Sequence, residues 1–260
     1  LMVSEFFDLE KKLSDQLVRL KELGICAVKA EFEAEGASFR DLLRLRRFTA
    51  EQNIPLHLKI GGVEALRDLK DALDLGVDGV IAPMVESPFG VVKFAEAVES
   101  VFGGRRLFKS INIETREAVE RVDDILEVAL GKIDNVTIGR TDLSRSYFDL
   151  VIQPDSPFIL DLIDRLSYKI QSVGLDLTVG GSLTSESVRI FSERKERLGD
   201  RVSSLETRKA IFPTERMLQE KDVLKESLRF EEIYLRFKLE CEAWLSRVDQ
   251  ERLTELKSRF

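Results

Sequence analysis

Ile111-Asn112-Ile113-Glu114-Thr115 and, about two dozen residues later, Ile138-Gly139-Arg140-Thr141-Asp142 are the stretches that decide the predicted fold. Each is an apolar run typical of a buried parallel strand, and each ends in a carboxylate. We therefore expect Glu114 and Asp142 at the ends of successive strands, where their oxygens would suit a hard cation such as Mg²⁺ or Mn²⁺. The alternative is that both acids only cap the helices that follow.

Strand-like and helix-like segments alternate through the first four-fifths of the chain, which is typical of a parallel sheet with helical crossovers. Helices are expected at 8–23, 63–75 and 117–130. We predict an α/β fold, a TIM-type (β/α)8 barrel. Its eighth strand would come from residues 1–7 if the barrel closes in the usual way, and otherwise the first strand is atypical. The seven strands predicted directly lie at 25–33, 56–60, 79–84, 107–113, 135–139, 176–179 and 201–205.

We assign the barrel to residues 1–213 and a C-terminal helical extension to residues 214–260. The extension is highly charged and helix-prone, and it carries the apolar residues Ile233, Phe237, Leu239, Cys241, Trp244 and Leu245. We expect two helices packed back on the barrel. An apolar stripe wider than one helix needs would instead indicate a contact with a partner subunit, and a homo-oligomer is expected.

Composition excludes several function classes. The chain has 260 residues with 43% hydrophobic content, enough for one large core. Its net charge of −7, with both signs interleaved, argues against nucleic-acid binding. The single histidine, His57, excludes a multi-histidine zinc site, and we expect it in a strand, facing the helices. No run of eighteen apolar residues predicts a membrane span, and we expect a cytoplasmic protein.

Three segments in this order resemble the HpcH/HpaI aldolase and citrate lyase family of the phosphoenolpyruvate/pyruvate barrel superfamily. They are LDLGVDGVIAPMVE at 73–86, IET at 113–115 and GRTDLS at 139–144, within a likeness that runs from about 14 to 146. Three others are similar to a branch associated with surface-sugar and secondary-metabolite gene neighbourhoods: VKAEFEAEG at 28–36, LKIGG at 58–62 and ETRK at 206–209.

The resemblance implies that Glu114 and Asp142 hold Mg²⁺ or Mn²⁺, which chelates the carboxylate and keto oxygens of a pyruvate-like substrate. A Lewis acid stabilises the enolate oxygen that develops during carbon–carbon cleavage, by several kcal/mol. Lys59 stands where the family places an arginine, so it is expected to carry positive charge toward the keto acid. Alternatively, Lys59 is an edge lysine paired with Glu64 or Glu86.

The family's general base is missing from this sequence. Its Asp-x-Glu-His motif corresponds to Glu31-Phe32-Glu33-Ala34, in which alanine replaces histidine. Glu33 is our first candidate for the base and Glu35 the second, because burial can raise a carboxylate pKa. Lys29 is another, since burial can lower its pKa in the same way.

Four further candidates each have a structural alternative. Arg140 could steady an anionic substrate or pair with Glu114. Glu86 could reach the site or cap the next helix. Gly180 and Gly181, with Ser182, could hold an anionic group at a helix N-terminus or form only a tight turn. Arg208 follows the last strand, where barrels often bind phosphate or carboxylate, but it could also form a surface salt bridge.

Together with these residues, the resemblance implies a metal-dependent carbon–carbon lyase or aldolase acting on a keto-acid substrate at a pyruvate-type enolate. A Schiff base on Lys29 or Lys59 is an alternative mechanism, which would leave Glu114 and Asp142 without a role. The alternative function is a non-catalytic keto-acid-binding barrel, or a scaffold subunit in a sugar or secondary-metabolite pathway.

Overall fold

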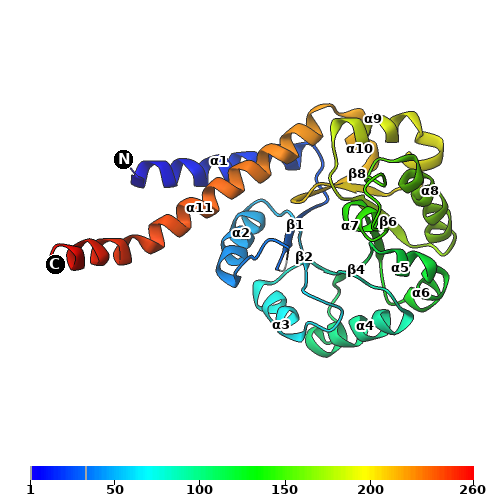
Figure 1. The fold of residues 1–260 in the computed structure, drawn as a ribbon, viewed down its shortest axis with the longest axis horizontal. Coiled ribbons are helices and arrows are strands. Elements are labelled where there is room, and N and C mark those ends of the chain that lie inside the picture. The colour runs from blue at the N-terminus through cyan, green and yellow to red at the C-terminus, as the bar shows by residue number, and fades with distance from the viewer. Residues whose placement is uncertain (1, 33) are drawn as a thin grey trace.

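Eight strands close into a barrel in sequence order (Figure 1). The computed structural model describes residues 2–32 and 34–260, with side chains from residue 6 onward. Strands β1 to β7 pair in parallel, whereas β8 runs antiparallel to both β7 and β1. The α/β barrel class is confirmed. The strands are β1 Ala27–Glu31, β2 Leu56–Lys59, β3 Gly79–Ala82, β4 Phe108–Ile113, β5 Asn135–Gly139, β6 Asp176–Gly180, β7 Ser204–Glu206 and β8 Ala210–Pro213.

The barrel does not close in the usual way, and the strand that such closure would require at residues 1–7 is not formed by residues 2–7. Leu1 lies outside the described residues, and the rest of that segment belongs to helix α1, Met2–Glu22. Phe6 continues the helical stripe of apolar side chains and packs against Phe237 with tilted rings, whose centroids lie 5.5 Å apart. The barrel is closed instead by β8, which follows β7 through a tight turn where the Thr207 amide donates to the Ala210 carbonyl at 2.9 Å.

Helices surround the barrel, and several begin at side-chain caps. Ser38, Ser87, Thr115 and Thr184 each accept a hydrogen bond from the first turn of the helix that follows. The helices after α1 are α2 Phe39–Glu51, α3 Leu66–Leu75, α4 Pro88–Phe102, α5 Arg116–Glu120, α6 Val122–Ala129, α7 Arg140–Arg145, α8 Pro157–Ser172, α9 Ser185–Glu193, α10 Thr214–Gln219 and α11 Asp222–Lys257, with a π-helical turn at Lys195–Gly199.

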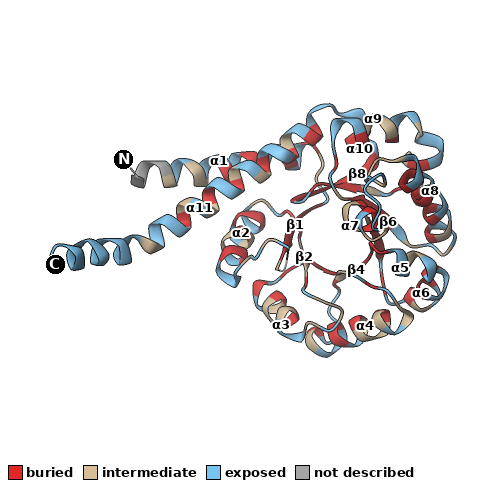
Figure 2. Ribbon diagram, in the orientation of Figure 1, coloured by how far each residue is buried: buried red, intermediate tan, exposed pale blue. Residues whose placement is uncertain are grey.

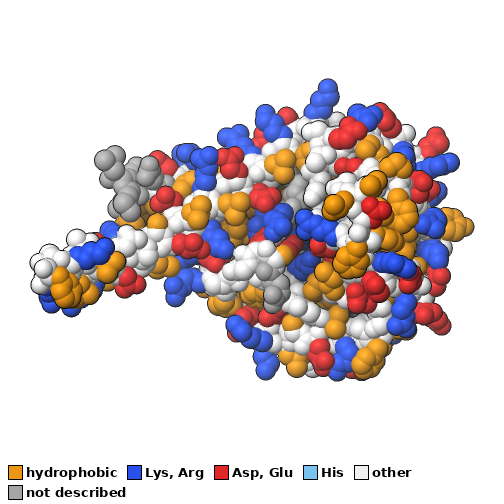
Figure 3. Space-filling view, in the orientation of Figure 1, with side chains coloured by type: hydrophobic (Ala, Val, Ile, Leu, Met, Phe, Trp, Pro, Cys, Tyr) orange, Lys and Arg blue, Asp and Glu red, His pale blue; other side chains and the backbone are white. Residues whose placement is uncertain are grey.

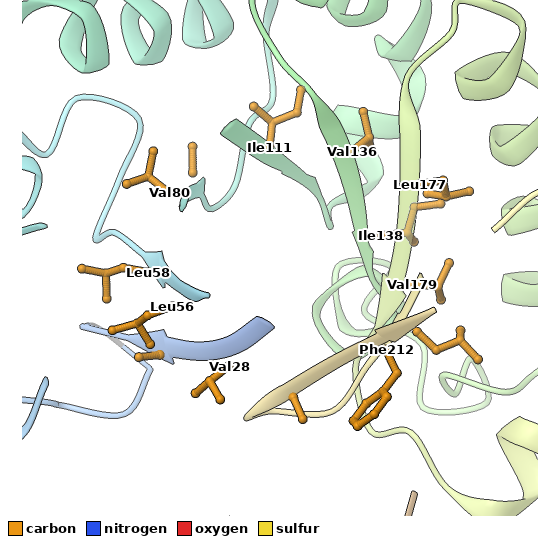
Figure 4. Close-up of a cluster of buried hydrophobic side chains, with 14 of the residues drawn as sticks. Val28, Leu56, Leu58, Val80, Ile111, Val136, Ile138, Leu177, Val179 and Phe212 are labelled. Carbon is orange, nitrogen blue, oxygen red and sulfur yellow. The ribbon is translucent and has the colours of Figure 1, made fainter. Parts of the chain in front are cut away.

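The apolar core lies between the strands and the helices. Val28, Leu58, Val80 and Ile111 point away from the barrel axis (Figure 4), and Figure 2 shows the buried faces of the helices turned toward the strands. Because side chains alternate along a strand, the intervening residues fill the barrel interior. Many of these are polar and hydrogen-bonded, including Ser110, Asn135, Thr137 and Thr178.

Helices α1 and α11 lie side by side and project from the barrel (Figure 1). Phe230, Tyr234, Phe237 and Cys241 of α11 are buried. Toward the C-terminus of α11, apolar side chains are exposed, at Trp244, Leu245, Val248, Leu253 and Leu256. Residues 214–260 thus contain the two expected helices, but α11 packs chiefly on α1. The expected homo-oligomer stays a prediction.

Charged side chains of both signs are interspersed over the face drawn in Figure 3. No helix among the described residues has the length and apolar character needed to cross a membrane.

Candidate active site

A cavity of about 550 Å³ opens at the carboxyl ends of the parallel strands. This end is where barrel enzymes place their chemistry, because the βα loops meet there. The cavity, which we call the mouth, is lined by side chains from five strands or their loops, from α7 and from α11. Its charged and amide residues are Lys29, Glu31, Lys59, Asn112, Glu114, Asp142, Arg145, Glu206, Arg208 and Glu231.

Glu114 is buried at the mouth and held by two hydrogen bonds. Its Oε1 accepts from the Met84 amide at 3.0 Å, and its Oε2 accepts from the Asn112 amide group at 3.0 Å. A Cβ on Gly139 would lie 3.1 Å from the Glu114 Cβ, so the glycine makes room for the acid. The cap of α5 is Thr115, and the alternative that Glu114 serves as the cap does not hold.

Asp142 lies in the first turn of α7 and lines the same mouth. Among the described residues, no hydrogen bond or ion pair engages its carboxylate. The described part of the chain contains no cluster of three or more His, Cys, Asp or Glu side chains arranged for a metal. Glu114 and Asp142 each supply carboxylate oxygens to the same cavity, and one or two carboxylates completed by water and substrate are the ligands that a cation such as Mg²⁺ takes.

Lys29 bridges two carboxylates deep in the mouth. Its Nζ lies 2.6 Å from Glu206 Oε1 and 3.2 Å from Glu31 Oε1, and all three side chains are buried. Burial lowers the pKa of Lys29, but the charges of Glu206 and Glu31 and the hydrogen bonds to them raise it further, so its net pKa lies above the ordinary value. The expectation of a lowered Lys29 pKa was wrong, and this ammonium is a poor base and nucleophile.

The pKa of Glu31 is shifted in the opposite direction to that of Lys29, so both groups keep their charge. Burial raises the Glu31 pKa, but the charges of Lys29, Lys59 and Arg208 lower it more, so the carboxyl ionises below its usual range. Glu31 is thus held as a carboxylate at neutral pH.

Besides Lys29, two other cations named from the sequence lie at the mouth, and one more was missed. Lys59 Nζ is 3.8 Å from Glu114 Oε1, and Arg208 lines the outer part of the cavity. Lys59 is not paired with Glu64, which binds Lys93 at 2.5 Å. Arg145 also lines the mouth; the sequence signal was its position three residues after Asp142 on the same helix.

Residues 45–150 match the family model described as HpcH/HpaI aldolase/citrate lyase. This segment is similar to that family. It contains β2 to β5, and with them Lys59, Glu114 and Asp142. The matched segment therefore includes both carboxylates, Glu114 and Asp142, that line the mouth.

Solved structures from the HpcH/HpaI family share the fold. A Desulfitobacterium hafniense HpcH/HpaI aldolase is 17% identical with a TM-score of 0.61, and the match covers 75% of this chain and 81% of that chain. A Burkholderia cenocepacia aldolase/citrate lyase family protein is 15% identical with a TM-score of 0.56, covering 88% of this chain and 84% of that chain. No curated protein matches the chain.

Arg140 does not line the mouth. Its guanidinium is fully buried and donates to the carbonyls of Gly180 at 3.0 Å and Gly181 at 2.8 Å, and it also binds Asp155. Of the two alternatives for Arg140, the guanidinium does not line the mouth where a substrate would bind, and its ion-pair partner is Asp155 rather than Glu114. It holds the loop after β6 in place, because the first turn of α7 directs its side chain toward the end of β6.

The glycine pair lies beside the mouth. Gly180 faces Gly139 in the register of β6 and β5, and Gly181 lines the cavity with φ at +86°. Helix α9 begins only at Ser185, capped by Thr184, so the pair does not itself start a helix. Ser182 follows and hydrogen-bonds the Thr141 hydroxyl at 3.0 Å.

Two further acids considered for the site, Glu35 and Glu86, lie outside the mouth. Glu33 lies outside the described residues. Glu35 binds Lys209 beneath α11 and does not line the mouth. Glu86 is exposed just before the Ser87 cap of α4, also outside the cavity lining. Neither Glu35 nor Glu86 therefore lines the mouth with the two carboxylates, Glu114 and Asp142.

His57 lies at the opposite end of the barrel from the mouth. It stacks on Phe108 with ring centroids 4.5 Å apart, and a Cβ on Gly79 would lie 2.6 Å from its ring. Leu56 and Leu58 face the helices, so His57 faces the interior; the expectation that it faces the helical layer was wrong. Burial lowers its pKa to about 4.

Proposed function

We propose that this chain is a divalent-metal-dependent carbon–carbon lyase of the aldolase type, acting at the methyl carbon of a pyruvate-type enolate. The observation that carries the proposal is the joint position of Glu114 and Asp142 in one mouth, with Lys59 beside them. The family match over residues 45–150 supports the same reaction class.

The residues of the mouth have separate roles in this proposal: Glu114 and Asp142 would hold the metal, and Lys59 would bind the substrate. The Met84 amide and Asn112 fix the Glu114 carboxylate, and Asp142 has no competing partner among the described residues. Mg²⁺ or Mn²⁺ held by this pair would supply Lewis-acid stabilisation of the negative charge on the keto oxygen. Lys59 would attract the substrate carboxylate as a point charge, without the planar fork of an arginine.

Proton transfer is the step for which the family's usual group is absent, because Ala34 stands in the histidine position. A working base must approach the methyl group to roughly 3 Å, directly or through one water molecule. We keep Glu33 as the proposed base from the sequence argument. The second candidate function, a barrel that binds a keto acid without catalysis, is favoured by this same missing histidine.

Exchange of the pyruvate methyl protons with deuterated water separates the two functions, because exchange needs a base whereas binding does not. Proton NMR of pyruvate with the chain and Mg²⁺ or Mn²⁺ should show the methyl signal disappear at a rate proportional to enzyme. Titration of pyruvate alone discriminates poorly, since both functions predict binding. Saturable pyruvate binding without exchange would contradict the lyase and favour the binding module.

A further inference from the structure

Two stretches singled out in the sequence, residues 28–36 and 206–209, lie side by side in the fold. Strand β1 pairs antiparallel with β8, which follows directly after the second stretch. Between the two stretches, the Lys209 ammonium donates a hydrogen bond to the Glu35 carboxylate. Neither side chain lines the mouth, so this ion pair needs an explanation other than contact with a substrate.

Lys209 is buried in a small polar cluster beneath α11. Its side chain is 1% exposed, and its Nζ lies 4.5 Å from the centroid of the Tyr234 ring. Glu35 Oε1 and the Tyr234 hydroxyl are buried and find no hydrogen-bond partner among the described residues. A buried ion pair is a weak source of stability, because removal of two charges from water offsets their attraction, and unpaired polar atoms add to the cost. Stability therefore does not explain the cluster, whereas it does fix Glu35 at one place.

Glu35 lies in the loop that joins β1 to α2, residues 32–38. The Ala37 amide donates to the Phe32 carbonyl at 3.2 Å, which closes this loop on itself. Ala34 lines the mouth, whereas its neighbour Glu35 points to the cluster beneath α11. The ion pair thus decides which side of the loop is turned toward the mouth.

We propose that Lys209 is a positioning residue: through Glu35 it fixes the β1–α2 loop, which carries the proposed base Glu33, and so sets the rate of proton transfer. This inference rests on the proposed function. A displacement of about 1 Å in a reacting group can lower a rate by about 100-fold. Pyruvate binding should be unaffected, because Lys59 and the two proposed metal ligands stand on or after other strands, β2, β4 and β5.

Amide hydrogen exchange, read by mass spectrometry, tests the loop without any activity. Lys209→Met removes the ammonium, and Lys209→Met with Glu35→Gln also removes the carboxylate charge that would otherwise stay buried, so the double variant should fold. A hydrogen bond between charged groups is worth about 10- to 100-fold. Peptides covering residues 32–38 should exchange faster by about this factor in both variants. Unchanged exchange of these peptides in both would overturn the inference.

Lys169→Met is the control for amide exchange, because it breaks an ion pair between α8 and α6. It should leave the exchange of peptides covering residues 32–38 unchanged. Faster exchange of these peptides in this control, to the same degree as in the Lys209 variants, would show general loosening and overturn the inference.

The rate of pyruvate methyl-proton exchange tests the consequence for the reaction. Lys209→Met should lower kcat by about 10- to 100-fold and keep KM for pyruvate within about 2-fold, a split that general unfolding does not produce. A faster-exchanging loop with unchanged kcat, or an effect confined to KM, would overturn the inference. Absence of methyl-proton exchange in the unmodified chain would overturn the lyase and the link to proton transfer, whereas amide exchange would still decide whether Lys209 holds the loop.

Discussion

Replacing Arg140 tests whether this buried guanidinium holds the loop after β6. Arg140→Met leaves the carbonyls of Gly180 and Gly181 without their donor and Asp155 without its cation. Breaking a buried ion pair by removing one partner costs about 3 to 5 kcal/mol. Asp155 is 25% exposed, so water compensates part of its loss, and we expect a decrease of about 3 kcal/mol in the free energy of unfolding.

Urea unfolding followed by circular dichroism measures this decrease, provided that the slope against urea stays the same. Arg145→Met is the matched control, because Arg145 lies on the same helix but is exposed and should change stability by less than about 0.5 kcal/mol. A loss below about 1 kcal/mol for Arg140→Met, or one equal to the control, would refute the positioning role.

Three further outcomes follow from the site and the barrel interior. Borohydride with pyruvate should leave no adduct on Lys59 or Lys29, since the Lys29 amine is held protonated; a stable mass adduct would establish a Schiff base instead. The folded-state pKa of His57 is about 4 against 6.5 for the free side chain, so the unfolded chain binds more protons between these values. Stability should therefore fall as pH drops from 6.5 to 4, by up to about 3 kcal/mol, and His57→Gln should flatten that dependence; an unchanged slope would contradict the burial of the ring. Glu33→Gln should abolish methyl-proton exchange while metal affinity persists, and full exchange in that variant would exclude Glu33 as the base.

The parallel strands could be predicted because each is an apolar run with a polar or glycine-rich end. Strand β8 could not, because Ala210–Pro213 follows β7 without an intervening helix and pairs antiparallel, outside the alternating βα pattern. The assumption that a strand must precede the first helix then placed a strand at residues 1–7. The helical stripe that begins with Phe6 was already visible there, and it is completed by packing against Phe237.

In the site as well, the features set by consecutive elements of the chain could be predicted, whereas contacts between residues far apart in the sequence could not. Glu114 and Asp142 follow adjacent strands, so the position of both acids at one mouth could be read from sequence order. The pairing of Lys29 with Glu206 joins residues 177 positions apart, and it depends on the way β8 brings β7 close to β1. The direction of Arg140 depends on how α7 leaves β5, which no residue pattern fixes.

The most direct test of the metal-dependent enolisation is deuterium incorporation into the pyruvate methyl group, compared across metal and carboxylate variants. The unmodified chain with Mn²⁺ should exchange the methyl protons, and removal of the metal should stop exchange. Asp142→Asn and Glu114→Gln should each lower the rate by about 100-fold or more at subsaturating Mn²⁺, as expected when a group that stabilises developing charge is lost. Exchange that persists without metal, or at the full rate in both variants, would contradict a metal-dependent enolisation at Glu114 and Asp142.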